Sequence, residues 1–344
     1  MIKPAEITPS RVLDDACRAR IKYASALKPG AHIHISGVCG SGTSAVLALL
    51  KKRGFYVSGS DKAFYPPMGA VVRGLADRLD EGYRPENLTP APELVVIGNA
   101  LSRGNPEVEA VLAQGIPFAS MPEVFAAQLI AERDYCRTSV VVAGTHGKTT
   151  TTAAIAYLLD ATGRKPGYFI GGVPENLAGN IRPVSEEIPV EQRVVVLEGD
   201  EYDSAFFAKY AKFHCYRPDI AVITSLEFDH GDIYNSVEEI EQEFTRFAAR
   251  LPEEGLILVC DQGERLQRLA ETWSKDKAIK APILRYGMEA ATRYRLCSRS
   301  LWCYQDVPRK RFGQKLELGI GEQELTVRTT LSGEHNALNL LAAR

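Results

Sequence analysis

The chain has 344 residues, of which 45% are hydrophobic and 24% charged, and its formal net charge is −2 at pH 7. At roughly 150 residues per domain, this length predicts about two domains. So small a net charge excludes a global positive field for nucleic acid or an anionic membrane surface. No apolar run approaches the roughly 20 residues that span a bilayer. The N-terminus lacks a signal-peptide pattern, so we expect a cytoplasmic protein.

The first part of the chain alternates short β-rich runs with helical stretches. We expect strands at 32–38, 55–61, 93–99 and 116–120, and helices at 43–53, 105–114 and 122–132. This alternation predicts a Rossmann-like α/β domain with a parallel sheet. The polar stretch AERDYCRTS then indicates a boundary, with domains at 1–133 and 134–344.

The second part continues the α/β pattern. Strands are expected at 139–143, 167–172, 193–199, 219–225 and 256–260, with helices at 149–162 and 237–250. A β-rich tail at 294–330 precedes a last helix that begins near Glu334. Seven cysteines without a C-x-x-C pair predict neither a disulfide framework nor a zinc knuckle.

The sharpest motif is VVVAGTHGKTTTT at 140–152, where a β-run enters a glycine turn and leaves as a helix. Gly144 and Gly147 let backbone N–H groups face a phosphate, Lys148 can neutralise the β and γ phosphates, and Thr149 can ligate Mg²⁺. Val142 stands where the usual phosphate loop has its first glycine. The pattern therefore predicts a triphosphate site, against a chance strand-turn-helix as the alternative.

Two acidic segments, VVVLEGDEYD and TSLEFDHGD, follow later strands. The carboxyl ends of parallel strands converge on one crevice, so Glu198 and His230 are candidate magnesium ligands near the phosphates. Taken alone, His230 would more often be a hydrogen-bonded loop residue.

A second glycine turn, HISGVCGSGTSAV, opens a helix after the first strand. Gly37, Gly40 and Gly42 offer that helix N-terminus to a pyrophosphate, and Asp61 ends the next strand, where an acidic residue commonly meets a ribose. The alternative is a turn without a ligand. Cys39, inside the turn, could pack or touch the ligand.

The last helix begins with His335 and Asn336, and Asn339 follows one turn later. Side chains at these offsets share a helix face and could hydrogen-bond a base. The alternative is a polar helix cap.

GTHGKTTT, EGDEYD, EFDHGD and GEHNALNLLAA, preceded by a glycine-rich domain, resemble the motifs of the Mur ligases, ATP-dependent enzymes of peptidoglycan assembly. The resemblance covers about residues 30–344. It implies an N-terminal Rossmann-like domain for a UDP-sugar and a central P-loop ATPase-like α/β domain, with ATP and Mg²⁺ as cofactors.

The resemblance also implies site residues. The implied catalytic residues are Lys148, Glu198 and His230, and the implied metal ligands are Thr149, Glu198 and His230. ATP binding is expected at Gly144, Thr145, His146, Gly147, Lys148, Thr149, Thr150, His335, Asn336 and Asn339. UDP-sugar binding is expected at Gly37, Cys39, Gly40, Gly42, Asp61, Ser102, Arg103 and Asn105.

Within the family, the resemblance implies a ligase that joins UDP-N-acetylmuramate to the tripeptide L-Ala-γ-D-Glu-meso-diaminopimelate in peptidoglycan recycling. The alternatives are an L-alanine ligase for the same donor, a non-catalytic nucleotide-sugar-binding fragment, and a nicotinamide-dependent oxidoreductase. The oxidoreductase hypothesis leaves the Lys148 loop unexplained. We expect no nucleic-acid or membrane partner, and the sequence does not indicate an oligomeric state.

Two features depart from the family pattern. Several Mur ligases use a carbamylated lysine beyond the magnesium histidine, whereas residues 231–250 contain no lysine. This favours the subgroup that accepts UDP-N-acetylmuramate itself. The family's C-terminal Rossmann-like domain, which helps to bind the amine substrate, is also absent, so we expect a truncated chain.

Overall fold

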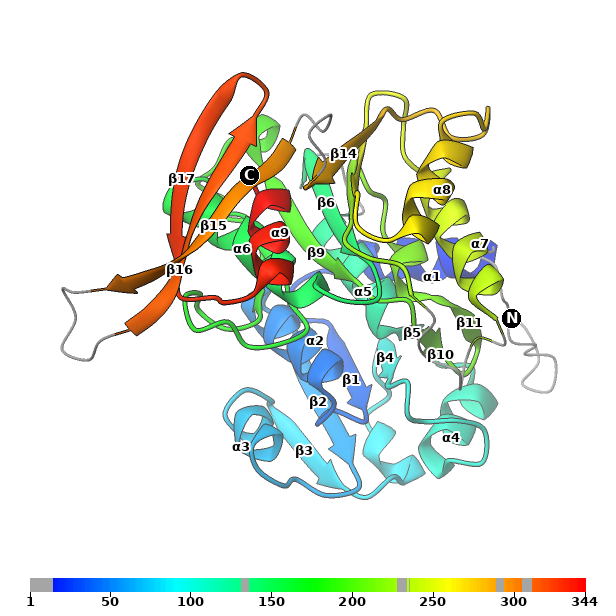
Figure 1. Ribbon diagram of the computed structural model, residues 1–344. Coiled ribbons are helices and arrows are strands. Elements are labelled where there is room, and N and C mark those ends of the chain that lie inside the picture. Colours follow the sequence, from blue (N-terminus) through cyan, green and yellow to red (C-terminus); the bar gives the residue numbers. More distant parts are fainter. Residues whose placement is uncertain (1–14, 131–135, 228–233, 235, 289–293, 305–310) are drawn as a thin grey trace. The chain divides into compact units, whose positions relative to one another are not determined.

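The structure is a computed structural model that describes residues 15–130, 136–227, 234, 236–288, 294–304 and 311–344 (Figure 1). The chain folds into two compact units, and it passes between them more than once. The first unit holds Met1–Arg137, Arg164–Val195 and Glu201–Arg217. The second holds Thr138–Gly163, Val196–Asp200 and Pro218–Arg344. The two domains expected at 1–133 and 134–344 stay a prediction.

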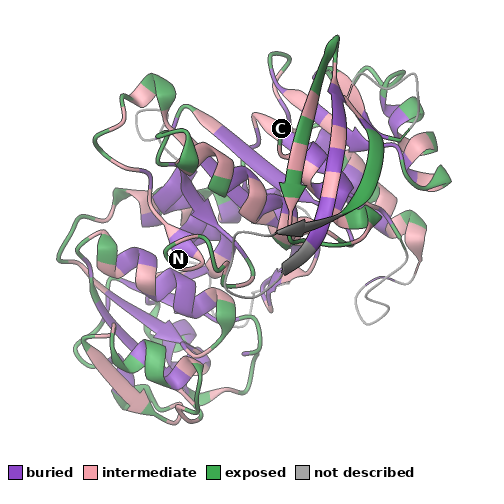
Figure 2. Cartoon of the chain, turned by 60° about the vertical axis from the view of Figure 1, so that its left-hand side comes forward, coloured by how far each residue is buried: buried purple, intermediate pink, exposed green. Residues whose placement is uncertain are grey.

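The first unit is built on a parallel sheet of the predicted Rossmann-like kind. Its strands are β1 (His32–Ser36), β2 (Tyr56–Asp61), β3 (Arg78–Glu81), β4 (Leu94–Ile97) and β5 (Phe118–Ser120). Their order is β3-β2-β1-β4-β5, and every pairing is parallel. The apolar run LVVI of β4 is buried throughout, as expected for a central strand covered on both faces (Figure 2).

The helices of this unit include two that the sequence did not predict, α1 and α3. They are α1 (Asp15–Ala26), α2 (Ser41–Lys52), α3 (Met68–Arg73), α4 (Pro106–Gln114) and α5 (Met121–Phe125). Short turns and strands complete the unit: η2 (Pro85–Leu88), η3 (Ala126–Ile130), β7 (Gly167–Phe169), β8 (Ile181–Arg182), η4 (Val190–Gln192), β10 (Asp203–Ala205), β11 (Ala208–Ala211) and η5 (Lys212–Cys215). The helix expected at 122–132 is observed as α5 continued by a π-helical turn, η3, to Ile130, and its last two residues lie outside the described residues.

The second unit carries the predicted central α/β sheet. Its strands are β6 (Thr138–Ala143), β9 (Val194–Gly199), β12 (Ile220–Ile223), β13 (Leu256–Cys260), β14 (Ile283–Gly287), β15 (Tyr294–Tyr304), β16 (Arg311–Ile320) and β17 (Gln323–Thr329). They lie in the order β17-β16-β15-β14-β13-β12-β6-β9. The pairings from β6 to β15 are parallel, and β15, β16 and β17 pair antiparallel. The β-rich tail expected at 294–330 is thus observed as strands, whose direction the sequence did not indicate.

The helices that accompany this sheet among the described residues are α6 (Lys148–Ala161), α7 (Val237–Ala248), α8 (Glu264–Trp273) and α9 (Glu334–Ala342). Helix α9 packs against α6 and β15. The sequence did not predict α8 or β14. In the described part of the chain, no helix combines the length and apolar character needed to cross a bilayer.

Helix α1 is fixed by a buried ion pair within the first unit. Arg20 Nε and Nη2 donate to Glu123 Oε1 at 2.9 and 2.7 Å, and Tyr210 Oη donates to the same oxygen at 3.2 Å. The guanidinium carbon lies 4.8 Å from the Phe207 ring centroid. The Glu123 side chain is fully buried, so its charge depends on these partners.

We expect Arg20→Met to lower the free energy of unfolding by about 3 kcal/mol, because it leaves a buried carboxylate without its cation. Urea unfolding measures the change. The matched control is Arg18→Met on the same helix, whose partner Asp15 has a side chain that is 99% exposed; its expected loss is below about 0.5 kcal/mol. Equal losses in the two variants would contradict the role of Arg20.

Candidate functional site

The glycine turn of the first unit connects β1 to α2. Gly37 adopts a φ of +81°, which glycine reaches without the steric cost that other residues bear. The N–H groups of Gly37 and Val38 donate to the Ser60 carbonyl at 2.9 and 3.0 Å. Thr43 Oγ1 donates to the Gly37 carbonyl at 2.6 Å. Gly40, at the N-cap of α2, has no side chain to cap the helix, so the first N–H groups of the helix suit an anion.

Asp61 closes this turn from the end of β2. Its Oδ2 accepts the Cys39 N–H at 2.8 Å, and its Oδ1 accepts the Lys62 N–H at 2.7 Å and the Tyr83 hydroxyl at 3.3 Å. Burial, followed by the Asp61 charge, raises the pKa of Cys39 to about 11 and that of Tyr83 to about 12. The Cys39 thiol is therefore protonated at neutral pH. A ribose contact for Asp61 stays a prediction.

The segment predicted to contact the sugar nucleotide follows β4, the neighbour of β1. Arg103 pairs with Glu109, with Nε 2.8 Å from Oε1. Asn105 Oδ1 accepts the N–H groups of Glu107 and Val108 at 3.0 and 3.2 Å and so caps α4. Ser102 is exposed. Sugar contacts from Ser102, Arg103 and Asn105 stay a prediction.

The phosphate loop of the second unit leaves β6 and enters α6. Gly147, the N-cap of α6, has a φ of +84°, and a Cβ there would lie 2.5 Å from Asn339 Oδ1. Lys148 Nζ donates to the carbonyls of Gly144 and Thr145 at 2.6 and 3.2 Å. The strand, glycine turn and helix expected at 140–152 are thus observed, whereas triphosphate binding by the loop stays a prediction. Thr150 is half-buried in the first turn of α6.

Thr149 and Glu198 lie together, as predicted. Thr149 Oγ1 donates to Glu198 Oε1 at 3.0 Å. Thr149 is in the first turn of α6, and Glu198 is near the end of β9. The distance brings together two of the three proposed metal ligands. The third, His230, lies outside the described residues.

The phosphate loop is held by residues that sequence reasoning missed. Ser225 Oγ accepts the His146 N–H at 2.8 Å, and the Ser225 carbonyl accepts the Thr145 N–H at 3.1 Å. Thr224 Oγ1 donates to the His146 carbonyl. Thr145 Oγ1 accepts the Glu227 N–H at 2.9 Å. The sequence carried one signal for these residues: the segment TSLE, at 224–227, directly follows a strand that can pair with β6.

Of the three residues of helix α9 that were predicted to contact ATP, Asn339 lies against the phosphate loop. Asn339 is buried and lies against Gly147. Asn336 is half-buried, and its Nδ2 donates to the Ser332 carbonyl at 2.8 Å. His335 is exposed. A base contact from this helix stays a prediction.

The candidate metal ligands at the phosphate loop present oxygen atoms, which Mg²⁺ prefers. A hydroxyl and a carboxylate meet at Thr149 and Glu198, so the residues present fit a magnesium ion. Among the described residues, no group of three or more His, Cys, Asp or Glu is arranged to hold a metal.

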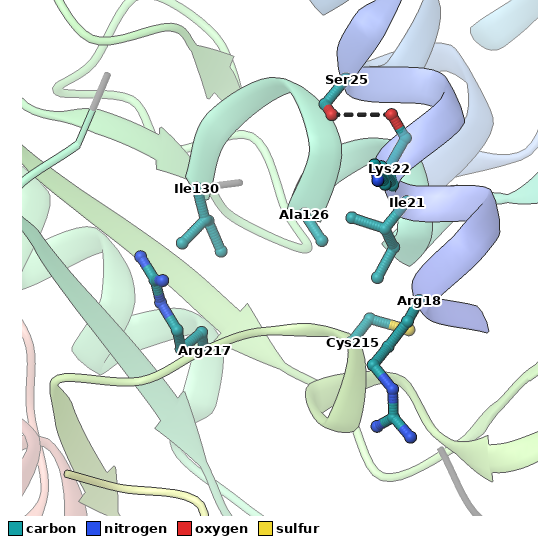
Figure 3. Close-up of a pocket in the computed structure, with 8 residues that line it drawn as sticks. All are labelled: Arg18, Ile21, Lys22, Ser25, Ala126, Ile130, Cys215 and Arg217. Carbon is teal, nitrogen blue, oxygen red and sulfur yellow. Dashed lines mark hydrogen bonds between the residues drawn. The ribbon is translucent and has the colours of Figure 1, made fainter. Parts of the chain in front are cut away.

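A separate hollow of about 260 Å³ lies in the first unit (Figure 3). It is lined by Arg18, Ile21, Lys22, Ser25, Ala126, Ile130, Cys215 and Arg217. These residues come from α1, η3 and the segment around η5. The glycine turn at 37–42 contributes none of these eight residues, so we do not assign the hollow to the sugar nucleotide.

Comparisons with known proteins match both parts of the chain to one family. The model for the Mur ligase middle domain matches residues 142–344. The model for the Mur ligase family, catalytic domain, matches residues 32–133.

Individual relatives carry two different names. UDP-N-acetylmuramate–L-alanyl-gamma-D-glutamyl-meso-2,6-diaminoheptandioate ligase of Escherichia coli (strain K12) is 41% identical over 249 residues, covering 72% of this chain and 52% of the relative. UDP-N-acetylmuramate–L-alanine ligase of Renibacterium salmoninarum is 33% identical over 312 residues, covering 90% of this chain and 60% of the relative. The chain thus spans between half and three fifths of the length of these relatives.

A solved structure from Neisseria meningitides is also similar. It is a UDP-N-acetylmuramate:L-alanyl-gamma-D-glutamyl-meso-diaminopimelate ligase with a TM-score of 0.78 and 33% identity. The match covers 91% of this chain and 92% of that one. The resemblance inferred from the motifs is therefore confirmed in sequence and in fold.

We expect Gly147→Ala to weaken ATP binding by at least about tenfold, because the new Cβ displaces Asn339 and disfavours the φ that aims the loop N–H groups. Isothermal titration calorimetry measures the affinity. The control is Gly163→Ala, at a φ of +79° with open space around it. Each change should cost at least about 1 kcal/mol of stability because both place a side chain at a positive φ, and Gly147→Ala should cost more because its Cβ also displaces Asn339. An equal loss of ATP affinity in both variants would contradict the prediction.

Proposed function

This chain belongs to the Mur ligase family, and on that premise we propose that it carries the donor and ATP sites of an amide-forming ligase. The ligase joins UDP-N-acetylmuramate to the tripeptide L-alanyl-γ-D-glutamyl-meso-diaminopimelate. The relatives of that name, at 41% and 37% identity, support this choice. The observation that carries the ATP site is the 3.0 Å contact between Thr149 and Glu198, next to Lys148.

The proposed reaction has two steps. A carboxylate is a poor electrophile, so the lactyl carboxylate of UDP-N-acetylmuramate first accepts the γ-phosphoryl group of ATP, which gives an acyl phosphate and ADP. The tripeptide amine then attacks the acyl carbon, loses a proton and expels phosphate. Lys148 and the N–H groups of the Gly144–Gly147 loop stabilise the transferring phosphoryl group, so catalysis rests on positioning and electrostatics.

Mg²⁺ belongs to the same proposal. Thr149 and Glu198 would hold one ion, and His230 would hold a second. When bound, the metal neutralises negative charge that develops on the phosphoryl oxygens. Glu198 also positions Thr149 through the hydrogen bond described above.

The remaining predicted residues serve substrate binding in this proposal. The glycine turn with Cys39, and Asp61, Ser102, Arg103 and Asn105, would bind the UDP-sugar. His335, Asn336 and Asn339 would contact the adenine or ribose of ATP. We place the activity in the cytoplasm, in peptidoglycan recycling and so in cell-wall biogenesis, cell shape and division.

A second candidate is an L-alanine ligase for the same donor. A relative of that name aligns with 90% of this chain, at 33% identity. The two candidates share the donor and the ATP site and differ only in the amine that attacks the acyl phosphate.

We expect Lys148→Ala in the full-length protein to slow ADP release by at least about 100-fold, because the transferring phosphoryl group loses its cation. The assay contains UDP-N-acetylmuramate, the tripeptide and ATP with Mg²⁺. Lys165→Ala is the control, since this half-exposed lysine pairs with Glu187 away from the loop sequence. A Lys148→Ala rate within about tenfold of wild type would overturn the proposed ATP site.

We expect UDP-N-acetylmuramate to raise the melting temperature of the chain and UDP-N-acetylglucosamine to leave it unchanged, because a ligand that binds only the folded state stabilises it. Thermal-shift measurements compare the two at equal concentration. Tripeptide and L-alanine, offered in parallel to the full-length protein, then decide between the two ligases. A shift with the glucosamine form alone would contradict the proposed donor, and a donor shift without ADP release would indicate a non-catalytic sensor.

A further inference from the structure

We propose that Glu107, a buried carboxylate on α4, is a positioning residue that sets the shape of the 37–42 glycine turn through Ser60. The inference rests on the proposed function of that turn as the UDP-sugar site.

The carboxylate of Glu107 is buried, and each of its two oxygens accepts a hydrogen bond. Its side chain is 0% exposed. Oε2 accepts the Ser60 hydroxyl at 2.5 Å, and Oε1 accepts Asn87 Nδ2 at 2.8 Å. His34 Nε2 lies 3.5 Å from Oε2 and is equally buried. A buried charge without such partners would cost several kcal/mol, so the network holds these side chains in one arrangement.

The charge of Glu107 persists at neutral pH. Burial by itself raises the pKa of this carboxyl, but hydrogen bonding and charge from His34, together with the Ser60 hydroxyl, bring the pKa below its ordinary value. The groups that face Glu107 come from three elements, β1, β2 and η2. Ser58 closes the network on the far side of His34, with its Oγ 2.8 Å from Nδ1. Glu107 is therefore an acceptor, and it fixes the direction of the Ser60 hydroxyl.

Ser60 transmits this constraint to the turn. Its carbonyl accepts the N–H groups of Gly37 and Val38, and Asp61, the next residue, accepts the N–H of Cys39. Two consecutive residues of β2 thus hold three consecutive N–H groups of the turn. The side chain of the first of the two is anchored by Glu107.

The start of α4 does not depend on Glu107 for its cap. Asn105 already caps this helix through its side-chain oxygen. The buried carboxylate instead accepts the Ser60 hydroxyl of β2, and Ser60 holds the turn that leads into the first N–H groups of α2. Displacement of those groups by a fraction of an ångström weakens their hydrogen bonds to an anion.

The test compares Glu107→Gln and Ser60→Ala with wild type. Hydrogen exchange of the amides in 37–42 is measured without ligand, and the dissociation constant for UDP-N-acetylmuramate is measured by calorimetry. We expect both variants to speed exchange in the turn and to weaken binding by at least about tenfold. The double variant should be little worse than either single one, because both changes break the same connection. ATP affinity should be unchanged.

Two controls separate positioning from stability. Glu86→Gln removes an exposed charge from η2, next to Asn87, and should change neither readout. Val111→Ala removes buried methyl groups from α4 and should lower the melting temperature without changing turn exchange or affinity. The inference is overturned if Glu107→Gln only lowers the melting temperature and, like Val111→Ala, changes neither hydrogen exchange in the turn nor the affinity for UDP-N-acetylmuramate.

The outcomes also separate this inference from the proposed function. If wild type does not bind UDP-N-acetylmuramate but Glu107→Gln still speeds exchange in the turn, the proposed donor is wrong and the positioning role stands. If wild type binds and both variants bind equally well, the positioning role is wrong and the donor stands. Should Glu107→Gln fail to fold, Ser60→Ala decides the question, because it removes only one hydroxyl.

Discussion

The parallel pairing of β6 with β12 is the constraint on which the phosphate loop depends. The register sets Ala143 opposite Ile223, so Thr224 follows its strand directly beside Gly144. A Cβ at Gly144 would lie 2.3 Å from Thr224 Oγ1, which leaves room only for glycine. If the register slipped by one residue, the side chains of Thr224 and Ser225 would each turn to the other face of the sheet. Their hydrogen bonds to the phosphate loop would then be lost.

The two glycine turns are held in the same manner, each within its own unit. In the first, Ser60 and Asp61 at the end of β2 accept N–H groups from the turn after β1. In the second, Ser225, just past the end of β12, accepts the N–H groups of Thr145 and His146 after β6. In both turns, residues at or just past the end of a neighbouring parallel strand accept the N–H groups of the turn. The first N–H groups of the helix that follows are of the kind that suits an anion.

The sequence was sufficient where the signal was local. The loop at 144–149 follows from one motif, and the Rossmann-like and central α/β sheets follow from alternating strands and helices. Contacts between residues that are distant in the chain could not be predicted from the sequence. The ribose contact predicted for Asp61 stays a prediction, and the sequence did not indicate that its carboxylate also accepts the Cys39 N–H. Thr224 and Ser225 were passed over because their partners lie about 80 positions away in the chain, and only strand register brings them together.

The ion pair of Arg20 has a consequence for biosynthesis. Arg20 pairs with Glu123, which also accepts the Tyr210 hydroxyl, and the whole of β6, α6 and β9 lies between Glu123 and Tyr210 in the chain. On a ribosome, α1 emerges long before the hairpin that carries Tyr210. The first unit therefore cannot complete its core until the phosphate loop has already been translated, and non-local closure of this kind slows folding. A nascent chain released before Arg217 would expose the apolar side of α5 and η3 to other proteins.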